Sequence, residues 1–211
     1  MNIKQFIFNT FMVNCYLLEN GTGEAILIDP ACYEDKEKAE LTGFVESNHL
    51  KVIRNINTHC HIDHILGNEF IDDTYGVRPE YHHDSKPFFV TSREIGLSFG
   101  YHLKRIPEPQ GFLNDGDLIP FGDSTLKVLF TPGHAAGSIC LYDEKNGIVF
   151  TGDVLFKDTI GRTDLPSGNF DHLMTSIRTK LFNLPDETVV LPGHGPHTTI
   201  GYEKMNNPFI R

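Results

Sequence analysis

The stretch Thr58-His59-Cys60-His61-Ile62-Asp63-His64 decides how this sequence is interpreted, because it places three histidines and an aspartate within six positions. It follows directly on a predicted strand at residues 52–57, so we expect a polar loop at a strand end. Neutral imidazole nitrogen and carboxylate oxygen are ligands that borderline metals such as zinc accept. A solvated histidine-rich loop is the alternative, but this density and spacing favour a metal site.

Three further candidate ligands each follow a predicted strand and have a glycine directly before them. They are His134 in Thr131-Pro132-Gly133-His134, Asp153 in Thr151-Gly152-Asp153 and His194 in Pro192-Gly193-His194. The preceding strands are expected at residues 125–130, 148–150 and 188–191. In layered α/β folds, ligands collect outside the ends of strands, so we expect all four segments to converge on one crevice.

The rest of the chain alternates strands and helices, and no linker, short repeat or low-complexity tract divides it. Further strands are expected at residues 3–8, 15–18, 25–28, 117–119 and 138–142, and helices at 33–48, 69–74, 92–99 and 170–182. Two strand-forming halves with helical cover predict a layered α/β sandwich with helices outside both sheets. The length fits one domain, which we expect to span residues 1–211.

Composition and charge narrow the class of partner. The chain has 18 Lys and Arg against 28 Asp and Glu, a formal charge of −10, which argues against nucleic acid and anionic membranes and favours a small molecule. The four cysteines form no CxxC pair, and no apolar run near the N-terminus has the length of a signal peptide or membrane span. We therefore expect a cytoplasmic protein; no motif predicts its oligomeric state.

Together these motifs resemble the metallo-β-lactamase superfamily, and specifically its glyoxalase II-like branch of hydroxyacylglutathione hydrolase-like proteins. The resemblance covers nearly the whole chain and implies the four-layer αβ/βα sandwich of that fold. The tail is similar to short single-domain members, so the C-terminal helical glutathione-binding domain is expected to be absent. The other segments that carry the resemblance are Asn14-Cys15-Tyr16-Leu17, Ile28-Asp29-Pro30, Gly161-Arg162-Thr163-Asp164, Pro192-Gly193-His194-Gly195-Pro196 and Thr199-Ile200-Gly201-Tyr202-Glu203.

The resemblance implies a binuclear metal centre as cofactor. It implies two divalent ions, with zinc expected and iron or manganese as alternatives. A metal-bridging hydroxide would attack a thioester carbonyl, and Asp63 would act as a catalytic residue by orienting the attacking water. The implied ligands are His59, His61 and His134 for one ion, Asp63, His64 and His194 for the other, and Asp153 as the bridge.

Arg162 lies nine residues beyond Asp153, where glyoxalase II-like proteins carry a basic substrate-binding residue. Its guanidinium would bind a substrate carboxylate, or else form a structural salt bridge with Asp158 or Asp164. Cys60 is expected to pack in the core rather than to bind metal. His197 is close enough in sequence to His194 to be a candidate for supporting that ligand.

Three functions compete. The first is hydrolysis of a thioester such as a hydroxyacyl-glutathione, which the stretch from Gly161 to Pro166 and the closing motif favour. The second is the sister activity of a persulfide dioxygenase, with one iron held by His59, His134 and Asp153. A non-catalytic metal-binding scaffold is the third, and the complete set of ligands argues against it. The thiol carrier is left open by the sequence.

Overall fold

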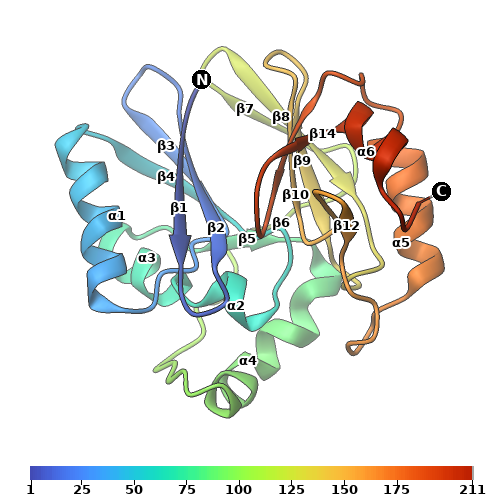
Figure 1. Ribbon diagram of the computed structural model, residues 1–211. Coiled ribbons are helices and arrows are strands. Elements are labelled where there is room, and N and C mark those ends of the chain that lie inside the picture. The colour runs from blue at the N-terminus through green and yellow to red at the C-terminus, as the bar shows by residue number, and fades with distance from the viewer. Residues whose placement is uncertain (211) are drawn as a thin grey trace.

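Two six-stranded sheets face each other in the computed structural model, which describes residues 1–210, and helices cover their outer faces (Figure 1). The expected four-layer αβ/βα sandwich is therefore confirmed. The first sheet runs in the order β1 (Asn2–Phe8), β2 (Val13–Glu19), β3 (Glu24–Ile28), β4 (Lys51–Ile56), β5 (Pro79–Tyr81) and β6 (Gly111–Phe112). The second runs in the order β14 (Thr198–Thr199), β13 (Val189–Pro192), β10 (Ile148–Gly152), β9 (Ile139–Asp143), β8 (Ser124–Phe130) and β7 (Leu118–Phe121).

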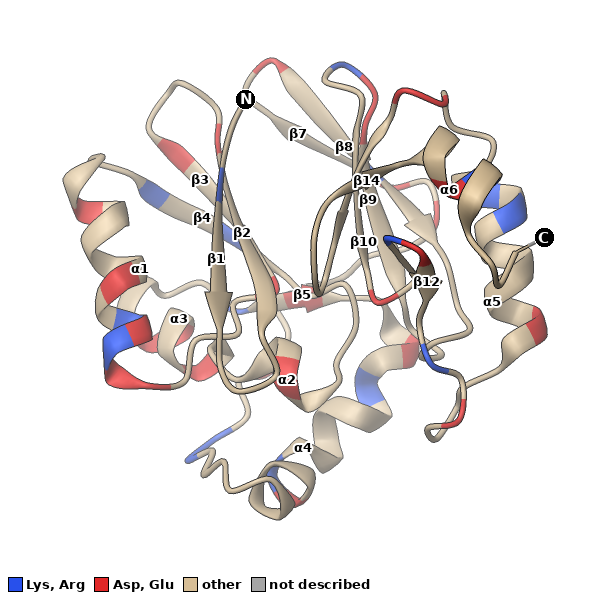
Figure 2. Ribbon diagram, in the orientation of Figure 1, with Lys and Arg blue, Asp and Glu red and all other residues tan. Residues whose placement is uncertain are grey.

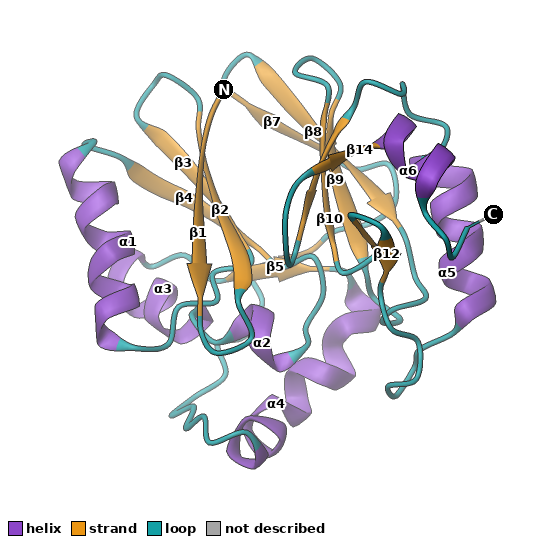
Figure 3. Cartoon of the chain, viewed as in Figure 1, coloured by secondary structure: helices purple, strands orange, loops and turns teal. Residues whose placement is uncertain are grey.

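The helices are distributed over the outer faces and one end of the sandwich (Figure 3). Two of them, α1 and α3, cover the first sheet, while α5 and α6 cover the second, and α2 and α4 lie across the end where the two sheets open. Their bounds are α1 (Asp35–Ser47), α2 (Ile62–Ile65), α3 (Asn68–Tyr75), α4 (Lys86–Ser98), α5 (Phe170–Ser176) and α6 (Ile200–Asn206). A small hairpin of β11 (Leu155–Phe156) and β12 (Thr159–Ile160) follows β10. No helix within residues 1–210 is both long and apolar enough to cross a membrane.

The core between the sheets follows from the two-residue period of a strand, which sends successive side chains to opposite faces. In β2, Leu18 faces the second sheet and packs with Phe150 of β10. Its neighbour Leu17 packs on the other face, against Leu41 of α1. Central strands are thus buried on both faces, and they are accordingly apolar along most of their length.

Most predicted elements are present, with shifted bounds. The expected loop at residues 58–64 is wrong for its second half, because α2 (Ile62–Ile65) already begins inside the motif. Helix α4 begins at Lys86 rather than at residue 92, since Pro87 is tolerated in a first helical turn, where its missing N–H donor is not needed. The helix expected at 170–182 ends as α-helix at Ser176 and continues as a π-helical turn over Ile177–Leu181.

Strand β7 allows a matched test of the core, because Leu118 is 64% exposed and its neighbour Ile119 only 1%. We expect Ile119→Ala to lower the free energy of unfolding by about 2–5 kcal/mol, the range for buried large-to-small changes. The change Leu118→Ala should stay within about 0.5 kcal/mol of the parent, as exposed sites do. Urea denaturation followed by circular dichroism measures both. Equal losses would contradict the assigned faces of β7.

Candidate metal centre

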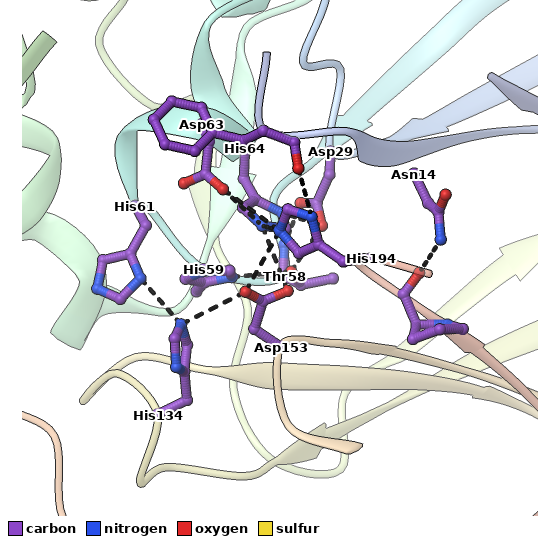
Figure 4. A network of polar contacts seen from close by, with 12 residues as sticks. Asn14, Asp29, Thr58, His59, His61, Asp63, His64, His134, Asp153 and His194 are labelled. Carbon is purple, nitrogen blue, oxygen red and sulfur yellow. Dashed lines mark hydrogen bonds and ion pairs between the residues drawn. The ribbon is translucent and has the colours of Figure 1, made fainter. Parts of the chain in front are cut away.

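All seven predicted ligands converge at the end of the sandwich where the two sheets open (Figure 4). The motif leaves β4 and enters α2, and the other three segments leave β8, β10 and β13. An isolated bridge between Val13 and His194 joins the two sheets at this point. The structure thus brings the strand ends together as the sequence predicted. Three overlapping groups of these side chains could each hold a metal ion, and the third shares residues with the first two; they are His59, His61 and His134, then Asp63, His64 and His194, and lastly His59, His64 and Asp153.

Asp29 fixes the motif in place. It follows β3, and its carboxylate accepts hydrogen bonds from the Thr58 backbone N–H and hydroxyl, both at 2.7 Å. The same carboxylate lies 3.0 Å from Nδ1 of His64. Asp29 itself has a φ of 49°, a left-handed conformation that is uncommon for a residue other than glycine. A buried carboxylate therefore connects the end of one strand to two positions of the motif on the next.

The first group consists of His59, His61 and His134. Nδ1 of His61 lies 2.9 Å from Nε2 of His134. The ring centroid of His59 lies 4.7 Å from that of His61 and 4.9 Å from that of His134. One nitrogen of each ring lies within 4.8 Å of the others, so the three imidazoles can reach a common ion.

The second group consists of Asp63, His64 and His194. Nε2 of His194 lies 3.3 Å from Asp63 Oδ2 and 3.3 Å from His64 Nε2. Asp63 Oδ2 and His64 Nε2 are 3.5 Å apart. The side chain of His64 is fully buried, whereas that of His194 is 27% exposed, so one side of this group opens towards solvent.

Asp153 lies between the two groups. Its Oδ2 atom is 3.7 Å from Nε2 of His134, in the first group, and 3.5 Å from Nε2 of His194, in the second. Its other oxygen, Oδ1, is 3.4 Å from Nε2 of His64. A single carboxylate therefore faces both groups, as a bridging ligand would.

Four of the five imidazoles are held from behind through Nδ1, which leaves Nε2 facing the centre. Such outer contacts fix the tautomer and orientation of metal-binding histidines. The partners of Nδ1 are the Thr58 hydroxyl for His59 at 3.2 Å, Asp29 Oδ2 for His64 at 3.0 Å, the Arg162 carbonyl for His134 at 2.8 Å and the Phe11 carbonyl for His194 at 3.0 Å.

Burial and charge shift the pKa values of the cluster in opposite directions. Burial, aided by neighbouring imidazoles, lowers the pKa of His61 to about 4 and that of His59 well below its ordinary value. Burial also opposes charge on His64, but Asp153 and Asp63 outweigh it and raise that pKa. The neutral imidazole is the form that binds metal. The carboxylates, in contrast, require nearby positive charge, which a cation supplies.

Two buried atoms show that the residues fit a metal ion. Within residues 1–210, His59 Nε2 and Asp153 Oδ1 lack a hydrogen-bond partner. Leaving such groups unpaired in the interior costs about 1–3 kcal/mol each. The two atoms belong to residues that form a possible ligand group with His64, whose ligand atoms lie within 4.8 Å of one another, and Figure 4 shows the three side chains side by side. A nitrogen and an oxygen atom without hydrogen-bond partners, among imidazoles that are held from outside, form a donor set suited to divalent cations.

The remaining sequence predictions have different outcomes. The Arg162 guanidinium forms two hydrogen bonds of 2.7 Å with Asp164, one of the two ion-pair partners expected for it. Cys60 is 1% exposed and packs in an apolar cluster, as expected. His197 hydrogen bonds with Gln5 at 2.8 Å, so its ring does not support His194 through that nitrogen.

Sequence reasoning missed the residues that hold the ligands from outside. Asp29 and Thr58 were visible only as parts of motifs, and nothing in the sequence paired the Asp29 carboxylate with His64. The carbonyl groups of Phe11 and Arg162 leave no signal in a sequence, because every residue carries a backbone carbonyl. These contacts become apparent only when the loops are placed in space.

Comparison with known proteins agrees with this geometry. Residues 9–194 match the metallo-β-lactamase superfamily, and the chain belongs to that superfamily. The hydroxyacylglutathione hydrolase GloC of Haemophilus influenzae is 34% identical over 212 residues, which cover 100% of this chain and 98% of that protein. The structure of TTHA1623 in a di-iron-bound form matches with a TM-score of 0.86 at 30% identity, over 98% of this chain and 99% of that one.

A further solved structure has a similar fold. ETHE1 from Myxococcus xanthus matches with a TM-score of 0.79 at 28% identity, over 99% of this chain and 84% of that one. Membership of the superfamily supports a metal-dependent hydrolase for the present chain.

The arrangement of two groups around Asp153 predicts about two metal ions per chain, because seven ligands exceed the three or four that one tetrahedral ion takes. Elemental analysis after purification without chelator and addition of zinc, iron or manganese measures the ratio. Asp153→Ala should leave at most about one ion, whereas His197→Ala, which changes a residue paired with Gln5, should keep about two. A ratio of one in the parent protein would contradict the binuclear centre.

Proposed function

We propose that this protein is a binuclear metal-dependent hydrolase that cleaves a thioester such as a hydroxyacyl-glutathione. The observation that carries the proposal is the completeness of both ligand groups, with the Asp153 carboxylate facing each of them. A mononuclear site would not need the second group of Asp63, His64 and His194. The likeness to GloC, a hydroxyacylglutathione hydrolase by name, supports a thioester as the substrate.

The chain's own residues have distinct tasks in this reaction. His59, His61 and His134 would hold one cation, Asp63, His64 and His194 the other, and Asp153 both. Two such cations lower the pKa of water towards neutrality and polarise a carbonyl group. Asp63 lines the adjoining cavity, and neighbouring imidazoles outweigh burial to lower its pKa. Its carboxylate is therefore ionised at neutral pH and can accept a hydrogen bond from the attacking water.

Thioester hydrolysis consumes only water, so the reaction should release one thiol per substrate cleaved and proceed equally without dioxygen. The test is lactoyl-glutathione cleavage by metal-loaded protein, followed with a thiol reagent under air and under argon. The four cysteines of the chain are buried and should add little background. Asp153→Ala is the control for metal-dependent turnover. An absolute requirement for dioxygen would falsify the hydrolase proposal.

A persulfide dioxygenase is the second candidate, and the likeness to ETHE1 is the observation that favours it. The structure also places Asp153 Oδ2 at 3.7 Å from His134 Nε2, with His59 beside them. One iron on these three residues, with dioxygen consumption on addition of a persulfide, would support this activity. The same argon experiment separates it from hydrolysis.

We further propose that Arg162 binds a carboxylate of the substrate. Its side chain is 61% exposed and lies on the wall of the cavity that adjoins the metal centre, while its carbonyl orients His134. The guanidinium already donates two hydrogen bonds to the Asp164 carboxylate, and its planar donors suit a carboxylate of the substrate equally. Either the substrate replaces Asp164, or the ion pair is purely structural.

Variants of this pair distinguish the two roles. If Arg162 binds substrate, Arg162→Ala should raise KM for a carboxylate-bearing thioester at least about fivefold and leave a neutral one within about twofold. Asp164→Asn should then lower KM for the charged substrate, because it frees the guanidinium and removes a like charge. Steady-state kinetics on the matched substrate pair measure both effects. Equal changes for both substrates, together with a lower melting temperature, would indicate a structural ion pair only.

A further inference from the structure

A cavity of about 740 Å³ opens directly from the metal centre, within the size range of small-molecule sites. Asp63, Asp153 and three of the imidazoles form one side of it. Helix α4, which lies across the open end of the sandwich, forms much of the other side (Figure 1). The apolar lining residues include Phe11, Phe88, Ile95 and Phe99.

One face of α4 supplies this wall. The residues that reach the cavity from the helix and its C-terminal end recur at helical spacing and carry apolar or hydroxyl side chains, namely Pro87, Phe88, Thr91, Ser92, Ile95 and Phe99. The charged residues of the helix, Lys86, Arg93 and Glu94, are not part of the lining. Figure 2 shows how few charges α4 carries beside α1, in a chain whose net charge is −10. The charges of α4 are therefore kept away from the cavity.

Aromatic contacts make this wall continuous with the metal centre. The Phe88 ring meets the His61 ring edge to face, with centroids 5.3 Å apart. The Phe11 ring meets the Phe99 ring in the same way at 5.3 Å, and the Phe11 carbonyl holds His194. A molecule whose reacting carbonyl lies at the metal centre can therefore place a neighbouring part against Phe88, Ile95 and Phe99.

The cavity lining offers few charged partners to a highly charged part of a substrate. Among the described residues that line the cavity, Arg162 alone has a Lys or Arg side chain, and it is paired with Asp164. Asp84 adds a negative charge. A charged group placed against Phe88 and Ile95 would gain no charged partner there, whereas an apolar group would bury its surface against them.

We propose that the α4 wall selects thioesters with an extended apolar arm, an aliphatic or aromatic group on the acyl or the thiol side of the scissile bond. This proposal rests on the proposed hydrolase function and names its substrate class. Ile95 is 38% exposed and Phe99 57%, so their apolar surfaces are accessible to such an arm. Arg162 is left to bind at most one carboxylate on another part of the substrate.

Two substrate series test the proposal and separate the acyl from the thiol side. The first places acetyl, butyryl, hexanoyl and octanoyl groups on N-acetylcysteamine, a small neutral thiol, and the second joins acetyl to ethanethiol, butanethiol and hexanethiol. For the metal-loaded protein, kcat/KM should rise about threefold to fourfold per added methylene in one of the series until the cavity is filled. A flat profile in both series would overturn the proposal.

A matched pair of variants on α4 locates the effect. Ile95→Gln should reduce the increase in kcat/KM per methylene to less than about twofold. Leu97→Gln is the control, because Leu97 lies on the same helix, is 54% exposed and is not part of the lining. A chain-length preference that survives unchanged in Ile95→Gln would place the arm elsewhere and overturn the assignment to α4.

Direct binding separates failure of this proposal from failure of the hydrolase function. Isothermal titration with methyl, hexyl and octyl thioethers of N-acetylcysteamine, which cannot be hydrolysed, should give tighter binding with length in the parent and in Leu97→Gln, and an increase in affinity below about twofold per methylene in Ile95→Gln. Length-dependent binding without any hydrolysis would contradict the proposed function and keep the apolar site. Hydrolysis whose rate, together with binding whose affinity, does not change with chain length would contradict the apolar site and support the hydrolase function.

Discussion

The Asp29 carboxylate makes the contacts on which the metal centre depends. It accepts two hydrogen bonds from Thr58 and lies against His64, so it determines how the motif leaves β4. Its side chain is 2% exposed, and removing such a buried acceptor would leave three donors without a partner. The Thr58 hydroxyl in turn orients His59. This one carboxylate therefore links the end of β3 to the end of β4, to His59 of the first ligand group through Thr58, and to His64 of the second group directly.

Close approach of backbone segments is the second constraint, and it explains two of the glycines. A Cβ atom on Gly193 would lie 2.3 Å from Asp153 Oδ1 and 2.8 Å from His64 Cε1. A Cβ atom on Gly152 would lie 2.3 Å from the Thr58 hydroxyl, and this residue has a φ of +48°. Any larger residue would displace the groups that it meets. The glycines before the ligands thus provide space, in addition to the tight turns that the sequence suggested.

The sequence predicted the sandwich and the convergence of the seven side chains because both depend on local patterns. Apolar alternation marks strands such as β8, and the position of His134 just beyond it fixes where that side chain emerges. Short elements such as β5, with three residues including Pro79, carry too little pattern to be found. Contacts such as His134 to the Arg162 carbonyl join segments 28 residues apart, and no local pattern encodes them.

The cavity has the polar metal ligands on one side and the apolar wall of α4 on the other, and the apolar wall affects the electrostatics of the metal centre. Phe88 meets the His61 ring and Phe11 lies on the cavity wall beside the ligands, and electrostatic interactions are stronger in apolar surroundings than in water. The side chains of Asp63 and Asp153 are only 16% and 12% exposed, so their carboxylates are costly without a compensating charge. Cation binding and folding of this region are therefore coupled, since ions that bind only the native arrangement stabilise it. The apolar wall that favours an apolar substrate arm thus also makes cation binding by the buried carboxylates more favourable.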